Sequence, residues 1–239
     1  KGGGVYIKMP SDSSLSNVEL YQNEAFTRGG GLEIEEGAKV AIDTSIFNEN
    51  RAGQMGGAIC IIAQTSKETV LSIDATTIEH NEAPSGGALY LSFSPQLSLN
   101  IQRSKFDSNT ASSIGGGAIC ALGGPSCADL PCEFKVDETT FVDNRAPVGS
   151  GGAVLLDRSD ADIQRSWFLG SSMLETNRAG KKCVDSRANE KVGNTNLDEE
   201  GNSEFYCSKR DANAIQGGGI ASRTVQSTVK LDSVRFEGL

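Results

Sequence analysis

The chain has 239 residues and a net charge of −9, from 22 Lys and Arg residues against 31 Asp and Glu residues. This acidic balance argues against nucleic acid or an anionic membrane as partner, because both carry negative charge. A hydrophobic content of 37% is too high for a disordered chain, whereas an aromatic content of 6% is too low for a large globular core. No run of 18 apolar residues is present, so we expect no transmembrane helix in this sequence.

The first recurring segment consists of glycines followed by a short alternating aliphatic run. It reads GGGVYI at 2–7, GGGLEI at 29–34, GGAICI at 56–61, GGALYL at 86–91, GGAICA at 116–121, GGAVLL at 151–156 and GGGIAS at 217–222. Alternation with a period of two is typical of β-strands, so Leu32 and Ile34 are expected to face the same side.

A second segment alternates with the first along the chain. Its pattern is aliphatic-x-aliphatic-[Asp/Gln]-x-small-x-Phe-x-x-Asn-x-Ala. Clear copies occupy 40–52, 71–83, 99–111 and 134–146, a degenerate copy ends at Ala25, another begins at Ala161, and the last begins at Val229. The aliphatic positions again have the strand period.

Together the two segments predict an all-β fold, a single-stranded right-handed parallel β-helix of about seven coils. Units of this length are too short for a strand-helix-strand repeat and show no helical pattern between their strands. Stacking successive coils about 4.8 Å apart would pair each strand in parallel with its own counterpart. We expect residues 1–239 to form one such domain of a longer protein, because the sequence begins and ends inside the repeat.

Two repeated positions are expected to form columns inside the stack. The aromatic column comprises Phe47, Phe106, Phe141, Phe168 and Phe236, with Ile78 replacing Phe once. The amide column comprises Asn23, Asn50, Asn81, Asn109, Asn144 and Asn177. Asn tolerates the left-handed conformation of a turn and can bond to the backbone, and stacked Asn side chains can form an amide ladder. Both columns are interpreted as scaffold.

Two excursions interrupt the repeat, and each contains a pair of cysteines. Cys127 and Cys132 lie in the loop 123–132, and Cys183 and Cys207 bracket the hydrophilic insertion 181–214. A disulfide at each pair is favoured over a Cys₄ zinc site, which needs shorter spacings. Disulfides are typical of an oxidising compartment, which favours an extracellular or cell-surface location with the export signal upstream of this sequence.

Two further cysteines occupy one repeat position, with a coil between them. Cys60 and Cys120 both end GGAIC, and Tyr90 occupies the equivalent position of the intervening coil. Two coils separate their Cα atoms by about 9–10 Å, beyond the reach of a disulfide. We expect half-buried thiols with no bond between them.

The pairing of GGA[I/L/V] with FxxN resembles the repeats of chlamydial polymorphic membrane proteins. The resemblance covers nearly the whole chain except 123–132 and 181–214, with Ile78 in place of Phe and Gly4, Gly31 and Gly219 in place of Ala. It implies a β-helix of the pectin-lyase-like superfold that works as a surface-exposed adhesin. It carries over no catalytic residue.

The main alternative is a carbohydrate-active enzyme, because many parallel β-helices cleave acidic polysaccharides with clustered carboxylates and a basic residue. The candidate row is Asp43, Asp74, Asp137 and Asp232 at one repeat position, interrupted by Gln102 and Gln164, with Arg103 and Arg165 beside it. This row follows the repeat, whereas an active site is expected to break it. The only histidine, His80, lies at a variable position and is expected to be exposed.

The sequence therefore predicts a non-enzymatic surface domain that serves adhesion or forms part of a larger extracellular assembly. The expected partner is a protein or a glycan at a cell surface, and no cofactor or metal is expected. A polysaccharide lyase or glycoside hydrolase on the same scaffold is the alternative.

Overall fold

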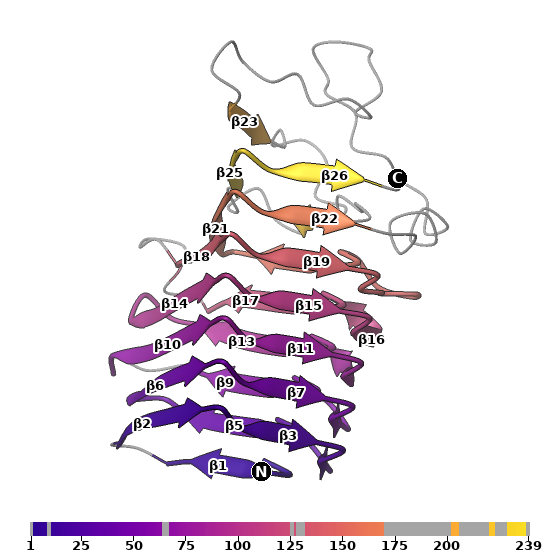
Figure 1. The fold of residues 1–239 in the computed structure, drawn as a ribbon. Coiled ribbons are helices and arrows are strands. Elements are labelled where there is room, and N and C mark those ends of the chain that lie inside the picture. Colours follow the sequence, from indigo (N-terminus) through magenta and orange to yellow (C-terminus); the bar gives the residue numbers. More distant parts are fainter. Residues whose placement is uncertain are drawn as a thin grey trace.

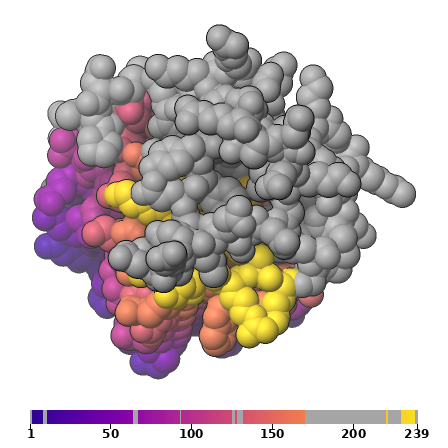
Figure 2. Space-filling model, turned by 90° about the horizontal axis from the view of Figure 1, so that it is seen from above, coloured from indigo at the N-terminus to yellow at the C-terminus, as the bar shows by residue number. Residues whose placement is uncertain are grey.

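The computed structural model describes residues 2–8, 11–63, 67–124, 127, 132–169, 202–205, 220–222 and 229–237. These residues form a parallel β-solenoid whose coils rise from the N-terminus to the C-terminus (Figure 1). Viewed from above along the stack, the later coils lie over the earlier ones (Figure 2). Among the described residues, no helix is long and apolar enough to span a bilayer.

Four sheets run along the solenoid, here named A to D. Sheet A contains β1 (Val5–Ile7), β5 (Leu32–Glu35), β9 (Ile59–Ile62), β13 (Leu89–Phe93), β17 (Ile119–Gly123), β20 (Val154–Asp157) and β24 (Ile220–Ser222). Sheet B contains β2 (Ser11–Ser16), β6 (Ala38–Asp43), β10 (Thr69–Asp74), β14 (Leu97–Gln102), β18 (Glu133–Asp137), β21 (Asp160–Gln164), β25 (Val229–Asp232) and β23 (Asn202–Phe205). Sheet C contains β3 (Glu19–Tyr21), β7 (Ile46–Asn48), β11 (Thr77–Glu79), β15 (Lys105–Asp107), β19 (Thr140–Val142), β22 (Trp167–Leu169) and β26 (Arg235–Glu237), and sheet D contains β4 (Glu24–Ala25), β8 (Arg51–Ala52), β12 (Glu82–Ser85) and β16 (Thr110–Gly115).

Every described strand except β23 pairs in parallel with the same repeat position of a neighbouring coil, which confirms the predicted fold class. Leu71, for example, lies between Val40 of the preceding coil and Leu99 of the following one. Sheets A and C each have seven strands, although the continuous part of the solenoid amounts to about five turns, slightly fewer than the seven coils expected.

The core is made by the alternate side chains that point into the coil. In β6, Val40 and Ile42 are buried while Ala41 between them is exposed. The aromatic column is stacked as predicted, with ring centroids 5.1 Å apart for Phe106 and Phe141 and 4.6 Å apart for Phe141 and Phe168. The stack continues to Phe236 at 4.9 Å. Stacked rings of this kind add to the stabilisation from their burial alone.

The amide ladder is present from Asn23 to Asn144, and Asn177 lies outside the described residues. Each Asn donates from Nδ2 to Oδ1 of the Asn one coil further on, over 2.9 to 3.0 Å. The backbone N–H of the same Asn also donates to that oxygen, over 3.0 Å from Asn81 to Asn109 and over 3.2 Å from Asn109 to Asn144. Asn109 Nδ2 additionally donates to the Ile78 carbonyl of the preceding coil at 2.8 Å.

The expected left-handed conformation does not fall on the ladder Asn residues. It falls on the residue before each, as at Glu49 (φ 54°) and His80 (φ 55°). The prediction was wrong in this detail because the turn has to direct the Asn side chain inward to the ladder. The residue that precedes it adopts the tight backbone conformation and keeps its own side chain outside, with His80 exposed as expected.

A second buried polar column occupies the repeat position that the sequence pattern defines only as a small residue. Its members are Ser45, Thr76, Ser104, Thr139 and Ser166. Thr76 Oγ1 donates to the Asp74 carbonyl at 2.7 Å and accepts the Ser45 N–H of the preceding coil at 3.4 Å. The Thr76 N–H in turn donates to Ser104 Oγ at 3.2 Å. The hydroxyl therefore satisfies two buried backbone groups at the corner between sheets B and C.

The paired glycines close the corner that leads into sheet A. Gly56 has a φ of 62°, which glycine adopts without steric cost. A Cβ atom at Gly57 would lie 2.2 Å from the Gly87 carbonyl oxygen of the next coil. The first glycine thus supplies the turn and the second allows close approach of the coils.

Part of the expected insertion 181–214 belongs to a sheet. Within it the structure describes only β23, which pairs with β25 in antiparallel orientation, with Ser203 opposite Leu231. The sequence predicted only that this insertion interrupts the repeat. The edge of β25 explains this pairing, because its unpaired N–H and C=O groups accept another strand.

Candidate functional site

The candidate catalytic row lies at the corner between sheets B and C. The structure brings its members into register as one column: Asp43, Asp74, Gln102, Asp137, Gln164 and Asp232. They end the strands of sheet B and are exposed or half-buried. The sequence therefore placed these residues together correctly.

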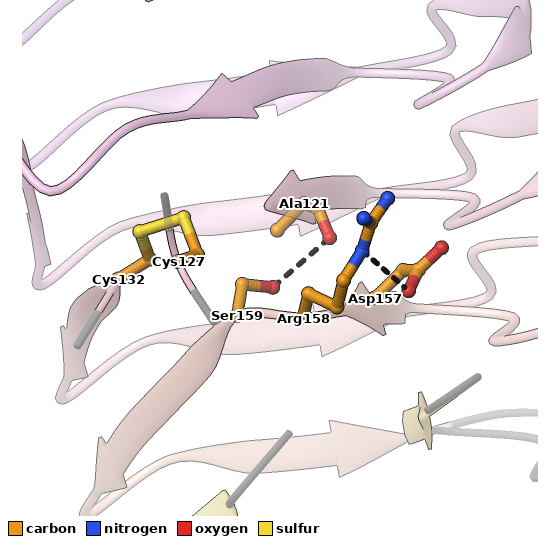
Figure 3. The surroundings of a disulfide bond; sticks show 6 residues. All are labelled: Ala121, Cys127, Cys132, Asp157, Arg158 and Ser159. Atoms are coloured by element: carbon orange, nitrogen blue, oxygen red, sulfur yellow. Dashed lines mark hydrogen bonds and ion pairs between the residues drawn. A yellow bond between two sulfur atoms is a disulfide. The ribbon is translucent and has the colours of Figure 1, made fainter. Parts of the chain in front are cut away.

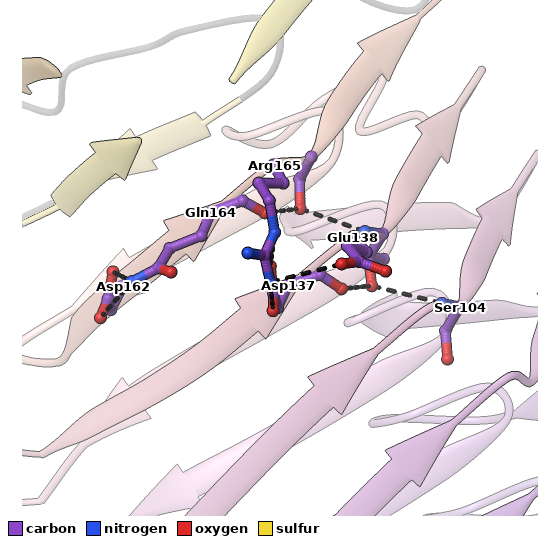
Figure 4. A network of polar contacts seen from close by, with 8 residues as sticks. Ser104, Asp137, Glu138, Asp162, Gln164 and Arg165 are labelled. Atoms are coloured by element: carbon purple, nitrogen blue, oxygen red, sulfur yellow. Dashed lines mark hydrogen bonds and ion pairs between the residues drawn. The ribbon is translucent and has the colours of Figure 1, made fainter. Parts of the chain in front are cut away.

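The neighbouring arginines bind this row across coils. Arg103 forms an ion pair with Asp74 of the preceding coil, and Arg165 forms one with Asp137. Arg165 Nε also donates to Asp137 Oδ1 at 3.1 Å, and its guanidinium lies 3.3 Å from Glu138 (Figure 4). The hydrogen bond to Asp137 raises the pKa of Arg165 above its ordinary value.

Backbone geometry fixes the direction of these arginines. Arg103 and Arg165 have φ values of 45° and 42°, and they occupy the turn position directly after the row. From there each side chain reaches back to the carboxylate one coil below. A left-handed backbone conformation is energetically unfavourable for residues other than glycine. Its recurrence at this turn in successive coils therefore indicates a structural requirement.

The row offers little of what acid–base chemistry needs. A general base needs a carboxylate that is open to the substrate, whereas Asp74 and Asp137 are each engaged by an arginine of the following coil. Asp43 has no arginine in the equivalent place, because the next coil has Ala75 there; it accepts a hydrogen bond from Ser16 at 3.4 Å instead. Across the ranges that the structure describes, no three His, Cys, Asp or Glu side chains converge as metal ligands.

The loop at 123–132 contains the predicted disulfide. Cys127 and Cys132 are bonded, with Cα atoms 5.4 Å apart (Figure 3). The next coil holds the base of this loop, because the Asp160 N–H donates to the Cys132 carbonyl at 2.8 Å and Ser159 Oγ donates to the Ala121 carbonyl at 3.0 Å. The second predicted pair, Cys183 and Cys207, lies outside the described residues.

The outer face of sheet A carries a second apolar cluster. Cys60, Tyr90, Cys120 and Leu155 follow one another in register, and Met55 packs against them. Both cysteines are thiols that are fully buried, rather than half-buried as expected. The alternating pattern assigns this position to solvent, but Met55 and its neighbours cover the outer face.

Burial in this cluster determines the chemistry of its polar groups. It raises the pKa of Cys60 to about 12 and that of the Tyr90 hydroxyl to about 12. A thiol with such a pKa is almost entirely protonated at neutral pH and is a poor nucleophile. The structure therefore assigns these cysteines to packing.

The outer face of sheet C carries two exposed aromatic residues, Tyr21 and Trp167, that the sequence patterns did not single out. Trp167 is 52% exposed and lies in register between Thr140 and Arg235. The signal that could have revealed it is its place directly before the buried Phe168, since neighbours along a strand point to opposite sides. This is the only Trp in the chain.

Comparison with known proteins supports the resemblance drawn from the repeats. The model of the Chlamydia polymorphic membrane protein repeat matches residues 44–62. This stretch includes Phe47 of the aromatic column, Asn50 of the ladder and the glycines that lead into β9. No curated protein and no solved structure matches the chain.

Proposed function

We propose that this chain, which contains a repeat similar to that of the Chlamydia polymorphic membrane proteins, is a non-catalytic domain exposed at a cell surface. It would serve adhesion or form part of a larger extracellular assembly. The matched repeat and the β-solenoid fold support a surface or structural role. The Cys127–Cys132 disulfide supports an oxidising compartment.

The main support for a non-catalytic role is how the acidic row at the corner between sheets B and C is used. Asp74 and Asp137 are bound by arginines of the following coils, and the arrangement recurs with the repeat. Catalytic carboxylates depend on environments that separate their pKa values and leave one of them able to exchange a proton. Here the ion pairs of Asp74 and Asp137 each connect two neighbouring coils.

A carbohydrate-active enzyme is the second candidate, and adjacent carboxylates favour it. Asp43 and Asp74 lie opposite each other in neighbouring strands, and Asp43 lies outside the arginine pairs. A pair of neighbouring carboxylates is the minimum set of catalytic groups that most glycoside hydrolases use. The row lacks a histidine, since His80 lies at another corner of the coil.

The decisive experiment measures turnover and binding in the same preparation. The full chain is incubated with polygalacturonate and alginate, with and without Ca²⁺, and released unsaturated or reducing ends are measured. We expect no turnover. Turnover that is lost in Asp74→Asn but kept in Asp160→Asn, a carboxylate outside the row, would assign the enzyme and overturn the proposal.

Binding separates the two non-catalytic roles. We expect the labelled chain either to bind intact cells saturably, as an adhesin does, or to sediment as a defined assembly with other extracellular material. Deletion of residues 184–201 leaves β23 in place and tests whether the rest of the insertion contributes. A chain that neither binds cells nor assembles would contradict both roles.

A further inference from the structure

The outer face of sheet C combines an exposed indole ring with acidic residues that outnumber the basic ones. In Figure 1 sheet C forms the front layer of the solenoid, and β19, β22 and β26 follow one another near its C-terminal end. Trp167 points outward there, 52% exposed, because Phe168 takes the inward position of the same strand. The ring therefore contributes little to the core.

The residues around Trp167 form a small surface with both apolar and polar groups. Thr140 precedes it in the same outward column and Arg235 follows it. Val142 and Leu169 are in register in the neighbouring outward column and are half-buried. The indole thus lies beside aliphatic side chains, with Thr140 and Arg235 as hydrogen-bonding groups on its two sides along the solenoid axis.

The cations of this face are already paired. Lys105 Nζ lies 2.7 Å from Asp107 Oδ2, and Arg235 forms an ion pair with Glu237. These are the only Lys and Arg residues on the described strands of sheet C. A polyanion would meet no uncompensated positive charge here, and the net charge of −9 would repel it further.

A neutral, hydroxyl-rich ligand matches this surface. We propose that Trp167 is the stacking platform of a binding site for a neutral glycan, with Thr140, Arg235 and Glu237 as its hydrogen-bonding rim. The inference rests on the proposed surface role and specifies its partner. An exposed Trp presents a large, rigid apolar surface that loses little conformational entropy on binding, and the apolar face of a sugar ring covers it. A carboxylate can accept hydrogen bonds from two sugar hydroxyl groups, and a guanidinium can donate hydrogen bonds to two of them.

The single Trp makes the site directly observable. Any change in intrinsic indole fluorescence on ligand addition reports on Trp167 alone. The full chain is titrated with neutral oligosaccharides of glucose, xylose, mannose, galactose and N-acetylglucosamine, and with oligogalacturonate as the acidic contrast. We expect at least one neutral oligosaccharide to change the emission saturably and the acidic one to leave it unchanged.

Two variants test the assignment on an immobilised array of the same oligosaccharides. Trp167→Ala is expected to lose at least tenfold in affinity, whereas Trp167→Phe retains part of the binding. Ile46→Ala is the matched control, because Ile46 is 41% exposed in the same outward column of sheet C but lies four coils away. Circular dichroism confirms that each variant is folded.

The outcomes separate this inference from the proposed function. Absence of any response to the neutral panel, binding that persists in Trp167→Ala, or binding of the acidic oligosaccharide alone would each overturn the glycan site. If the chain still binds cells through a protein partner in those cases, the surface role stands without the glycan site. Glycan turnover would overturn the non-catalytic role instead.

Discussion

Replacing Asn109 by Ala tests whether the amide ladder holds the coils together. The side chain is fully buried and takes part in four hydrogen bonds. Its Oδ1 accepts the N–H and the Nδ2 of Asn81, and its Nδ2 donates to the Ile78 carbonyl and to Asn144 Oδ1. Truncation removes all four.

The cost follows from which partners are left without a substitute. Asn81 Nδ2 keeps the Phe47 carbonyl, and Asn144 Oδ1 keeps the Asn109 N–H. The Asn81 N–H loses its side-chain acceptor and the Ile78 carbonyl loses its side-chain donor inside the stack. The Ile78 carbonyl remains part of the parallel pairing of β11 with β15, so the Asn81 N–H is the group left unsatisfied, and the free energy of unfolding should fall by about 1–3 kcal/mol.

Urea unfolding followed by circular dichroism measures this loss. Asn100→Ala is the matched control, because Asn100 lies on the half-buried outer side of β14, and its loss is expected to stay within about 0.5 kcal/mol. The ladder would be refuted as a stabilising element if Asn109→Ala shifted the transition no more than Asn100→Ala does.

Three further predictions concern the loop, the thiols and the ion pairs. Replacing Cys127 and Cys132 by Ser should lower stability by about 2 kcal/mol, because the bond closes a short loop; an unchanged melting temperature would show that the loop needs no bridge. Cys60 should resist iodoacetamide at pH 8 in the folded chain and react after denaturation, since burial raises its pKa to about 12, and peptide mass spectrometry would reveal early labelling if this is wrong. Arg165→Ala should destabilise slightly at low salt and not at about 1 M NaCl, because the exposed pair with Asp137 is screened; a loss that is independent of salt would point to packing instead.

The sequence predicts most of the interior of the coil because the interior repeats. Val40 and Ile42 have the strand period, and Phe106 and Asn109 recur with each coil, so both their burial and their stacking follow from position alone. The candidate row at Asp74 is also placed correctly, since residues at one repeat position must stack.

Features that depend on neighbouring coils could not be derived from one repeat unit. The pattern indicates an outward position for Cys60, but Met55, which lies before β9, packs against the cluster that contains it. The left-handed turn at His80 is chosen by the geometry that the ladder requires and not by the preference of histidine. Trp167 has no counterpart in the other coils, so a search for recurring residues passes over it.

The hydrogen bonds from backbone N–H groups to the side chains of the two buried polar columns all run toward the following coil. The N–H of Asn81 donates to Asn109 of the following coil, and the N–H of Thr76 donates to Ser104 of that coil. Two buried amides of a coil therefore obtain their acceptors only when the next coil has been laid down. The coil at the growing end of the stack therefore lacks these two acceptors until the next coil has formed.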